Sequence, residues 1–155
     1  MSDTVAEPTV TGPLAGVRVI EVAGEASAWA GRLLADLGAD VVLVEPPGGH
    51  HTRTWGPFAD DIEDPERSLW FWHYHASKQG LVIDLDDPAG QDRFRQLVAG
   101  ADVLVESEPP RRIATLLGDR PARLIHAAIT PQGQDGRDDL PVTDLTILAA
   151  GGPVW

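Results

Sequence analysis

The sequence predicts an α/β fold with a mainly parallel sheet and flanking helices. The first observation is an apolar strand, Val17–Val22, which is followed by a helical stretch, Ala26–Leu37, and a second apolar strand, Val41–Val44. Strand, helix and strand in this order make a βαβ unit. The second observation is that strand and helix patterns continue to alternate along the rest of the chain. A length of 155 residues is enough for one such domain.

The first helix is predicted by the spacing of its apolar residues. Trp29, Leu33, Leu34 and Leu37 recur at close to the helical period, and Gly38 supplies a C-terminal stop. The strand that follows is a continuous apolar run, as expected for a parallel strand that is buried on both faces.

Residues 46–80 show little periodicity, so we expect a long loop there. Loops of this length in a compact domain are usually functional or disordered. The loop contains an acidic run over residues 60–66, which we interpret as a solvated face, and an aromatic cluster, Trp70–Tyr74. This cluster either covers the sheet edge or a partner chain, or stacks on an adenine. Packing is the interpretation that we favour.

The second half of the chain repeats the alternation with clear boundary signals. Asp87 and Pro88 are typical of a helix N-cap and first helical position, and Phe94, Leu97 and Val98 give that helix an inward face. The remaining strands are expected at Leu81–Leu85, Val103–Val105 and Leu124–Ile129. The helix that starts at Pro88 is expected to end at Gly100, and a short helix over Arg112–Leu117 is expected to end at Gly118. A last helix is expected with Thr143 or Asp144 as its cap.

Composition excludes several classes of protein. The net charge of −12 argues against nucleic acid and anionic membranes as partners. The chain has no apolar run of about 18 residues, so no transmembrane helix is expected. The absence of cysteine excludes disulfides and thiolate sites and fits a cytoplasmic protein. The polar, acidic residues 1–12 are expected to form a disordered tail.

Familiar catalytic and nucleotide-binding motifs are missing. The loop after the first strand has one glycine, where a dinucleotide fingerprint needs several, and neither a P-loop nor a Gly-x-Ser-x-Gly motif occurs. The pairs His50–His51 and His73–His75 lack the ligand number and spacing of a zinc site, so they are interpreted as surface residues. We therefore predict no metal site, and the residues alone indicate no nucleophile.

Three carboxylates close predicted strands, namely Glu21, Glu45 and Glu106. Residues at the carboxyl ends of parallel strands face the ligand crevice of an open α/β sheet. The alternative is structural, in which these carboxylates cap nearby helices or pair with arginine.

A set of short segments in fixed order carries a resemblance to a known family. Each segment looks like a recurrent motif of that family. The motifs lie at residues 13–22, 30–41, 78–85, 101–106, 133–136 and 150–152. The chain thus resembles the class III coenzyme A-transferases of the formyl-CoA and carnitine CoA-transferase type, collinearly over nearly all of residues 13–152. The family also contains α-methylacyl-CoA racemase. Thr143 stands where the racemase branch has histidine, which favours the transferase branch.

The resemblance implies a Rossmann-like large domain that binds coenzyme A, in a homodimer whose two chains interlock. It also implies transfer of CoA between carboxylic acids through an aspartyl anhydride and an aspartyl-CoA thioester, which needs an aspartate nucleophile and main-chain N–H groups for the oxyanion. In the family, that aspartate lies some two dozen residues beyond the motif that ends at Gly152. Asp144 fits an earlier position of the family, which is not the nucleophile. Residues 13–155 are therefore expected to be a truncated N-terminal CoA-binding domain that is inactive without the missing half.

Coenzyme A is expected at the carboxyl edge of the sheet, as a substrate and not as a permanent cofactor. The adenosine end is expected near Ile83, Leu85 and Ser107, and the pantetheine near the loop Gly24–Ser27. The phosphates are assigned to arginines, through charge-assisted hydrogen bonds, with pairing to surface carboxylates as the structural alternative. Asp86 and Glu108 would repel those phosphates. The predicted binding residues are Glu25, Ala26, Arg53, Ile83, Leu85, Ser107 and Arg112.

Two other functions stay open from the sequence. One is a non-catalytic module that binds acyl-CoA or a protein partner, and the other is a complete small enzyme with unrelated chemistry. The lack of a grouped nucleophile and base argues against the second. Acyl-CoA and small carboxylic acids are the expected ligands, and a second copy of the chain or a complementing chain is the expected partner.

Overall fold

The computed structural model describes residues 12–135 and 142–151. Strands and helices alternate along the chain, and an additional α-helix and two short 3-10 helices lie between β2 and β3. The elements are β1 (Arg18–Val22), α1 (Ala28–Asp36), β2 (Asp40–Glu45), η1 (His51–Thr54), η2 (Ala59–Asp61), α2 (Leu69–His75), β3 (Gln79–Val82), α3 (Pro88–Ala99), β4 (Val103–Glu106), α4 (Arg112–Leu117), β5 (Ile125–Ala128) and α5 (Asp144–Ala150).

The described strands form one parallel sheet in the order β3-β2-β1-β4-β5. β1 lies at the centre, where Ile20 is in register with Val42 of β2 on one side and with Leu104 of β4 on the other. Because the chain builds outward from β1 first to one side and then to the other, the strand order reverses between β1 and β4. The predicted α/β class with a Rossmann-like parallel sheet is therefore confirmed.

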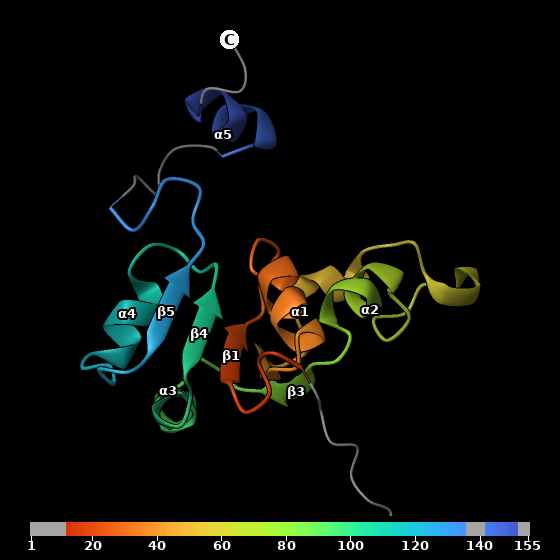
Figure 1. The fold of residues 1–155 in the computed structure, drawn as a ribbon. Coiled ribbons are helices and arrows are strands. Elements are labelled where there is room, and N and C mark those ends of the chain that lie inside the picture. The colour runs from red at the N-terminus through yellow and green to blue at the C-terminus, as the bar shows by residue number, and fades with distance from the viewer. Residues whose placement is uncertain (1–11, 136–141, 152–155) are drawn as a thin grey trace, which may run out of the picture.

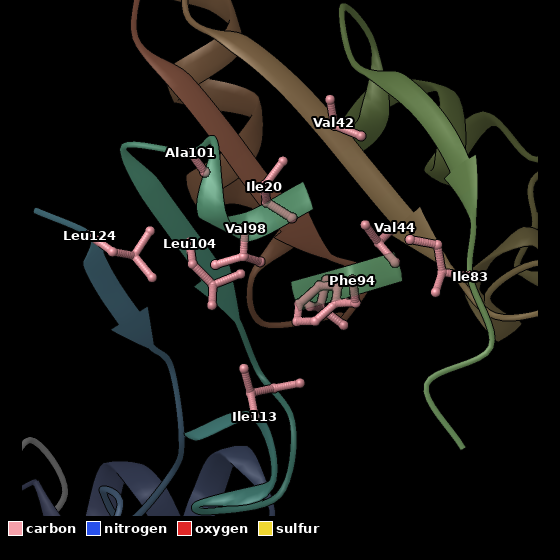
Figure 2. Packing of buried hydrophobic residues seen from close by; sticks show 11 residues of the cluster. Ile20, Val42, Val44, Ile83, Phe94, Val98, Ala101, Leu104, Ile113 and Leu124 are labelled. Carbon is pink, nitrogen blue, oxygen red and sulfur yellow. The ribbon is translucent and has the colours of Figure 1, made fainter. Parts of the chain in front are cut away.

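Helices cover both faces of the sheet, with α3 and α4 on one face and α1 and α2 on the other (Figure 1). Alternate strand residues point to opposite faces. On the α3 side, Phe94 and Val98 pack with strand residues such as Ile20 and Val44, and all of them are fully or almost fully buried (Figure 2). On the α1 side, a smaller cluster joins Val19, Val41 and Val105 to small residues of α1.

The helix α1 turns its small residues toward the sheet. Ala28, Gly31 and Ala35 are its buried residues, whereas Trp29, Leu33 and Leu37 are about half exposed. The helical period was predicted correctly, but the large apolar residues that reveal it form an exposed row. Small residues face inward because the helix lies close over a buried polar cluster.

The helix α2 contradicts the expectation of a long loop over residues 46–80. Ser68 is its N-cap, and the Ser68 hydroxyl accepts a hydrogen bond from the Phe71 N–H (3.1 Å) while it donates to the Trp55 carbonyl (2.6 Å). The favoured interpretation of the aromatic cluster as a packing element agrees with its position, since the His73 ring stacks on Trp29 of α1.

Most predicted boundaries agree with the structure. The Asp87 carboxylate caps α3 by accepting the Gly90 N–H (3.0 Å), α4 has the predicted bounds, and Thr143 is the N-cap of α5. The third strand differs, since it was predicted as Leu81–Leu85 and β3 is Gln79–Val82. It therefore begins two residues earlier and ends three residues earlier than predicted. Its apolar residues Ile83 and Leu85 instead follow the strand and pack in or against the core.

The expected tail over residues 1–12 lies outside the described residues, except for Gly12, whose carbonyl accepts the Ala15 N–H (3.1 Å). Within the described ranges, no helix is both long and apolar enough to cross a bilayer.

Candidate functional site

A pocket of about 590 Å³ opens at the carboxyl edge of the sheet, where the strand order reverses. The loops that follow β1 and β4 form its floor, and the segments that follow β2 and β5, with the start of α5, form its walls. α5 lies beyond the carboxyl ends of β4 and β5 (Figure 1). Reversal of strand order separates the two flanking loops, and ligands of open α/β folds bind in the resulting crevice.

Small residues hold the floor of this pocket together. A Cβ on Gly24 would lie 2.1 Å from the Ser107 Oγ, so a larger residue at this position would force the Ser107 hydroxyl to move. The buried Ser27 Oγ lies 3.2 Å from the carbonyl oxygens of Val22 and Gly24, and it accepts a long hydrogen bond from the Ser107 Oγ (3.4 Å). The loop after β1 is thus tied to its own strand and to the loop after β4.

A smaller pocket of about 150 Å³ adjoins the first at the ends of β1, β2 and β3. Ala23, His50 and Glu108 line both pockets, so these residues stand at their junction. The two pockets together form an elongated crevice along the carboxyl edge of the sheet.

Six of the seven predicted binding residues line this crevice. Glu25, Ala26 and Ser107 line the larger pocket, whereas Ile83, Leu85 and Arg112 line the smaller one. Their grouping follows from the parallel topology, which brings the carboxyl ends of all the strands to one edge. That these residues contact a ligand stays a prediction.

Arg53 lies in neither pocket lining and is engaged in other contacts. Its guanidinium forms two hydrogen bonds with the Glu45 carboxylate (2.7 and 2.8 Å), a third with Glu66 (3.0 Å), and stacks over the Phe71 ring at 3.8 Å. Burial raises the pKa of Glu45, but the hydrogen bonds from Arg53 and the His50 N–H outweigh burial and leave that pKa below its usual range. For Arg53 to hold a phosphate, it would have to give up this ion pair.

Arg112 reaches the crevice already paired with two carboxylates. Its guanidinium contacts Glu108 and lies 2.7 Å from the Asp86 carboxylate. Burial disfavours its charge, but these two carboxylates outweigh burial and raise the pKa of Arg112. A phosphate group at Arg112 therefore has to compete with both carboxylates.

The strand-closing carboxylates have structural partners. Each is buried and paired within the described part of the chain: Glu21 with Lys78 (2.7 Å), Glu45 with Arg53 (2.7 Å) and Glu106 with His126 (3.0 Å). Glu45 lines the smaller pocket, whereas Glu21 and Glu106 line neither of the two. The geometry therefore supports a structural role for all three residues, but the predicted pairing with arginine applies to Glu45 alone.

Sequence reasoning missed the two histidines of the crevice. His50 and His51, interpreted as plain surface residues, line the larger pocket together. The available signal was their position directly after a strand and a Gly-Gly turn, because such positions lie at the carboxyl edge of a parallel sheet. Among the described residues, no group of three or more His, Asp or Glu side chains is arranged to hold a metal ion.

A buried polar cluster lies beneath α1, next to the floor of the crevice. The Lys78 ammonium is 2.7 Å from Glu21 Oε2, donates to the Ala28 carbonyl (3.0 Å), and lies 3.1 Å from His75 Nδ1. Burial raises the pKa of Glu21 to about 7, although Lys78 opposes this shift. Burial, reinforced by the Lys78 charge, lowers the pKa of His75 to about 3. His75 is therefore neutral, and its Nδ1 accepts from Lys78.

The neutral His75 makes a testable contribution to the pH dependence of stability. The unfolded chain binds a proton at His75 as the pH falls below about 6.5, whereas the folded chain binds it only near pH 3, so stability is lost over that window. Glu21 acts in the opposite direction, because its raised pKa adds stability as the pH falls from about 7 towards 4.5.

The variant His75→Gln isolates this contribution. The free energy of unfolding of the variant minus that of wild type should be about 2 kcal/mol larger at pH 5 than at pH 8. The reason is that glutamine keeps a hydrogen-bond acceptor and cannot titrate. Urea unfolding at the two pH values measures the difference, from which the Glu21 contribution cancels. If the difference between variant and wild type were the same at both pH values, His75 would be protonated in the folded state at pH 5.

Comparison with known proteins gives a consistent result. The sequence profile of CoA-transferase family III matches residues 14–155. Succinyl-CoA:(R)-benzylsuccinate CoA-transferase subunit BbsE of Thauera aromatica is 37% identical over 145 residues, which cover 89% of this chain and 35% of that protein. Succinate–glutarate CoA-transferase of Agrobacterium fabrum is 42% identical over 135 residues, which cover 80% of this chain and 34% of that protein.

Solved structures agree with the sequence relatives. A CAIB/BAIF family protein from Brucella suis superposes with a TM-score of 0.73 at 33% identity, over 91% of this chain and 39% of that one. Rv3272 from Mycobacterium tuberculosis gives a TM-score of 0.76 at 29% identity, over 92% of this chain and 41% of that one. The chain thus spans about a third of the length of the curated relatives cited above.

Proposed function

This chain belongs to CoA-transferase family III, and on that premise we propose that it forms the CoA-binding part of an enzyme that moves coenzyme A between carboxylic acids. The observation that carries the proposal is the elongated crevice at the carboxyl edge of the sheet, where the strand order reverses and two pockets meet. This is the place where open α/β folds bind extended cofactors.

The proposed substrates are an acyl-CoA and a small carboxylic acid. The relatives named above support this class, because their names pair succinyl-CoA with benzylsuccinate, or succinate with glutarate. Pantetheine would enter over the floor loops beside Glu25, Ala26 and Ser107, and adenosine would lie towards Ile83 and Leu85. Arg112 would contact a phosphate.

In the proposed reaction, an aspartate carboxylate attacks the acyl-CoA carbonyl and releases the CoA thiolate. The thiolate then attacks the aspartyl carbonyl of the anhydride and displaces the acid, which leaves an aspartyl-CoA thioester for the second acid. We place that aspartate outside these 155 residues, as the resemblance implies. The isolated chain would then bind CoA without turning it over, and measured acyl exchange by the pure 155-residue protein would contradict this assignment.

Association with a second copy or a complementing chain is part of the proposal, as is a cytoplasmic location. Association is supported by the exposed apolar row Trp29, Leu33 and Leu37 along α1. Apolar patches of this kind usually mark interaction surfaces. Light scattering after size exclusion measures the assembly, and a strictly monomeric protein at high concentration would contradict self-association.

Calorimetric titration with CoA tests the binding function. We expect a saturable heat, whereas no heat at millimolar CoA would overturn the proposal and leave a partner-binding module as the alternative. The substitution Asp86→Asn sharpens this test, because it removes one of the two carboxylates that compete for Arg112. CoA affinity should rise about threefold, as expected for loss of one exposed repulsive charge.

The matched control is Asp92→Asn. Asp92 is also a largely exposed carboxylate; it pairs with Arg95 on α3 (2.6 Å) and lies outside both pockets. Its replacement makes the same change in net charge. An equal gain in both variants would mean that only net charge matters, and that Arg112 is not a phosphate contact.

A further inference from the structure

We propose that His50 is a specificity-determining residue of the crevice, which donates a hydrogen bond from Nε2 to a carbonyl oxygen of the bound thioester or its pantetheine arm. This inference rests on the proposed function. It concerns a group that the sequence pattern did not single out, and it follows from three features of the structure.

The first feature is position. His50 follows β2 at the carboxyl edge of the sheet and lines both the larger and the smaller pocket. A ligand long enough to occupy both pockets must pass beside its ring. The pantetheine arm of an acyl-CoA is such a ligand, and its hydrogen-bonding groups include amide and thioester carbonyl oxygens.

The second feature is the preferred tautomer of the ring. The Thr52 N–H makes a long hydrogen bond to His50 Nδ1 (3.5 Å), and the Thr52 Oγ1 lies 2.9 Å from the same nitrogen. A main-chain N–H can only donate, and a hydroxyl can donate as well, so the two contacts together favour Nδ1 as the acceptor, with the proton of the neutral ring on Nε2. The His50 N–H donates to the Glu45 carboxylate (3.0 Å), which holds the backbone in place.

The third feature is that the ring is neutral and one edge is free. Burial is the main cause that lowers the pKa of His50 to about 4, and the neighbouring His51 adds to the effect. Within the described residues, Nε2 makes no hydrogen bond. The crevice therefore has a neutral hydrogen-bond donor at the junction of its two pockets. The charged side chains that line the larger pocket are all acidic, namely Glu25, Glu108 and Asp144.

A carbonyl group suits this donor better than an anion does. Three carboxylates in the same pocket disfavour a negative charge, and a neutral imidazole does not compensate for it. A carbonyl oxygen accepts the Nε2 proton at no electrostatic cost. The two sources of such an oxygen, the pantetheine amides and the acyl thioester, are distinguished by comparing CoA with acetyl-CoA.

Two substitutions separate the two nitrogens of His50. In His50→Asn, the side-chain oxygen reaches the position of Nδ1 and keeps the acceptor for Thr52, but no donor reaches the position of Nε2. In His50→Gln, the amide nitrogen reaches towards Nε2 and keeps the donor. His73→Asn is the matched control, because His73 is exposed on α2 and lies outside both pockets.

Calorimetric titration of the full chain with CoA and with acetyl-CoA decides the question, with thermal unfolding as a check on folding. We expect His50→Asn to lose about fivefold in affinity, which is the usual effect of one neutral hydrogen bond, and His50→Gln and His73→Asn to stay near wild type. A loss with both ligands assigns the pantetheine amide, and a loss with acetyl-CoA alone assigns the thioester. Unchanged affinity of His50→Asn for both ligands, with normal binding by wild type, overturns this inference alone, whereas no binding by wild type overturns the proposed function and this inference together.

Discussion

Replacement of Lys78 by methionine is expected to lower the free energy of unfolding by about 3–5 kcal/mol, which is the usual effect of removing one partner of a buried ion pair. The side chains of Lys78 and Glu21 are 1% and 0% exposed, and their charged atoms are 2.7 Å apart. Methionine fills a similar volume, so the loss would come from the buried Glu21 carboxyl group, which must either stay charged without its cation or take up a proton.

The Lys78 ammonium also joins three elements that are distant in the sequence. It donates hydrogen bonds to the Ala28 carbonyl in the first turn of α1 and to His75 Nδ1 at the end of α2, and it forms an ion pair with Glu21 in β1. The ammonium is thus hydrogen-bonded to α1 and α2 and ion-paired with β1. Its loss would weaken the attachment of α1 and α2 to the sheet, and α1 directly follows the floor loop of the crevice.

Urea unfolding followed by tryptophan fluorescence measures this effect. Arg93→Met is the control, because it removes a cation from the exposed surface of α3. The double variant Glu21→Gln/Lys78→Met should recover at least half of the lost stability, since no charge is then buried without a partner. Equal stability of Lys78→Met and Arg93→Met would refute a structural role for the pair.

Introduction of a single methyl group at Gly31 is the second large expected effect. A Cβ at this position would lie 1.7 Å from Glu21 Oε2 and 2.5 Å from the carboxyl carbon. Neither group can move easily, because the carboxylate is held by Lys78 and the helix is packed on the sheet. We expect Gly31→Ala to lower the free energy of unfolding by about 3 kcal/mol, at the upper end of the usual cost of overpacking.

Gly100→Ala provides the matched control. Gly100 ends α3 with φ −93°, and a Cβ there would meet its nearest neighbour, the Leu97 carbonyl oxygen, at an ordinary 3.7 Å. This variant should stay within about 0.5 kcal/mol of wild type or be slightly more stable. If Gly31→Ala were as stable as Gly100→Ala, the close approach of α1 to Glu21 would be wrong.

Local patterns in the sequence predicted most of the architecture. Apolar runs marked β1, β2 and β4, Asp87 and Thr143 marked helix starts, and Gly118 marked a helix end. These signals are short-range, because a cap or a strand depends mainly on residues within one or two turns. The position of the crevice was also predictable, since it follows from a parallel sheet and its strand order.

The helix α2 escaped prediction because its stability comes from tertiary contacts. Its seven residues are Leu-Trp-Phe-Trp-His-Tyr-His, which are mostly weak helix formers and show no clear polar face. The helix is stabilised by the Ser68 cap and by stacking of its aromatic rings on α1 and on the segment around Trp55. The position of Arg53 could not be predicted for the same reason. Its guanidinium stacks on Phe71 of α2, and the sequence did not predict that helix.

By itself, the sequence determined the order of the strands and of the helices other than α2, most of their ends, and membership in the family. The tertiary structure alone decided which side of α1 is buried, that Arg53 lies outside the pocket linings and pairs with Glu45, and that His50 stands between the two pockets with one nitrogen free. The physical reason is the range of the interactions. Backbone hydrogen bonding and residue periodicity act between near neighbours, whereas the partner of a buried charge or an imidazole comes from a distant segment and is fixed only when the sheet has brought the two together.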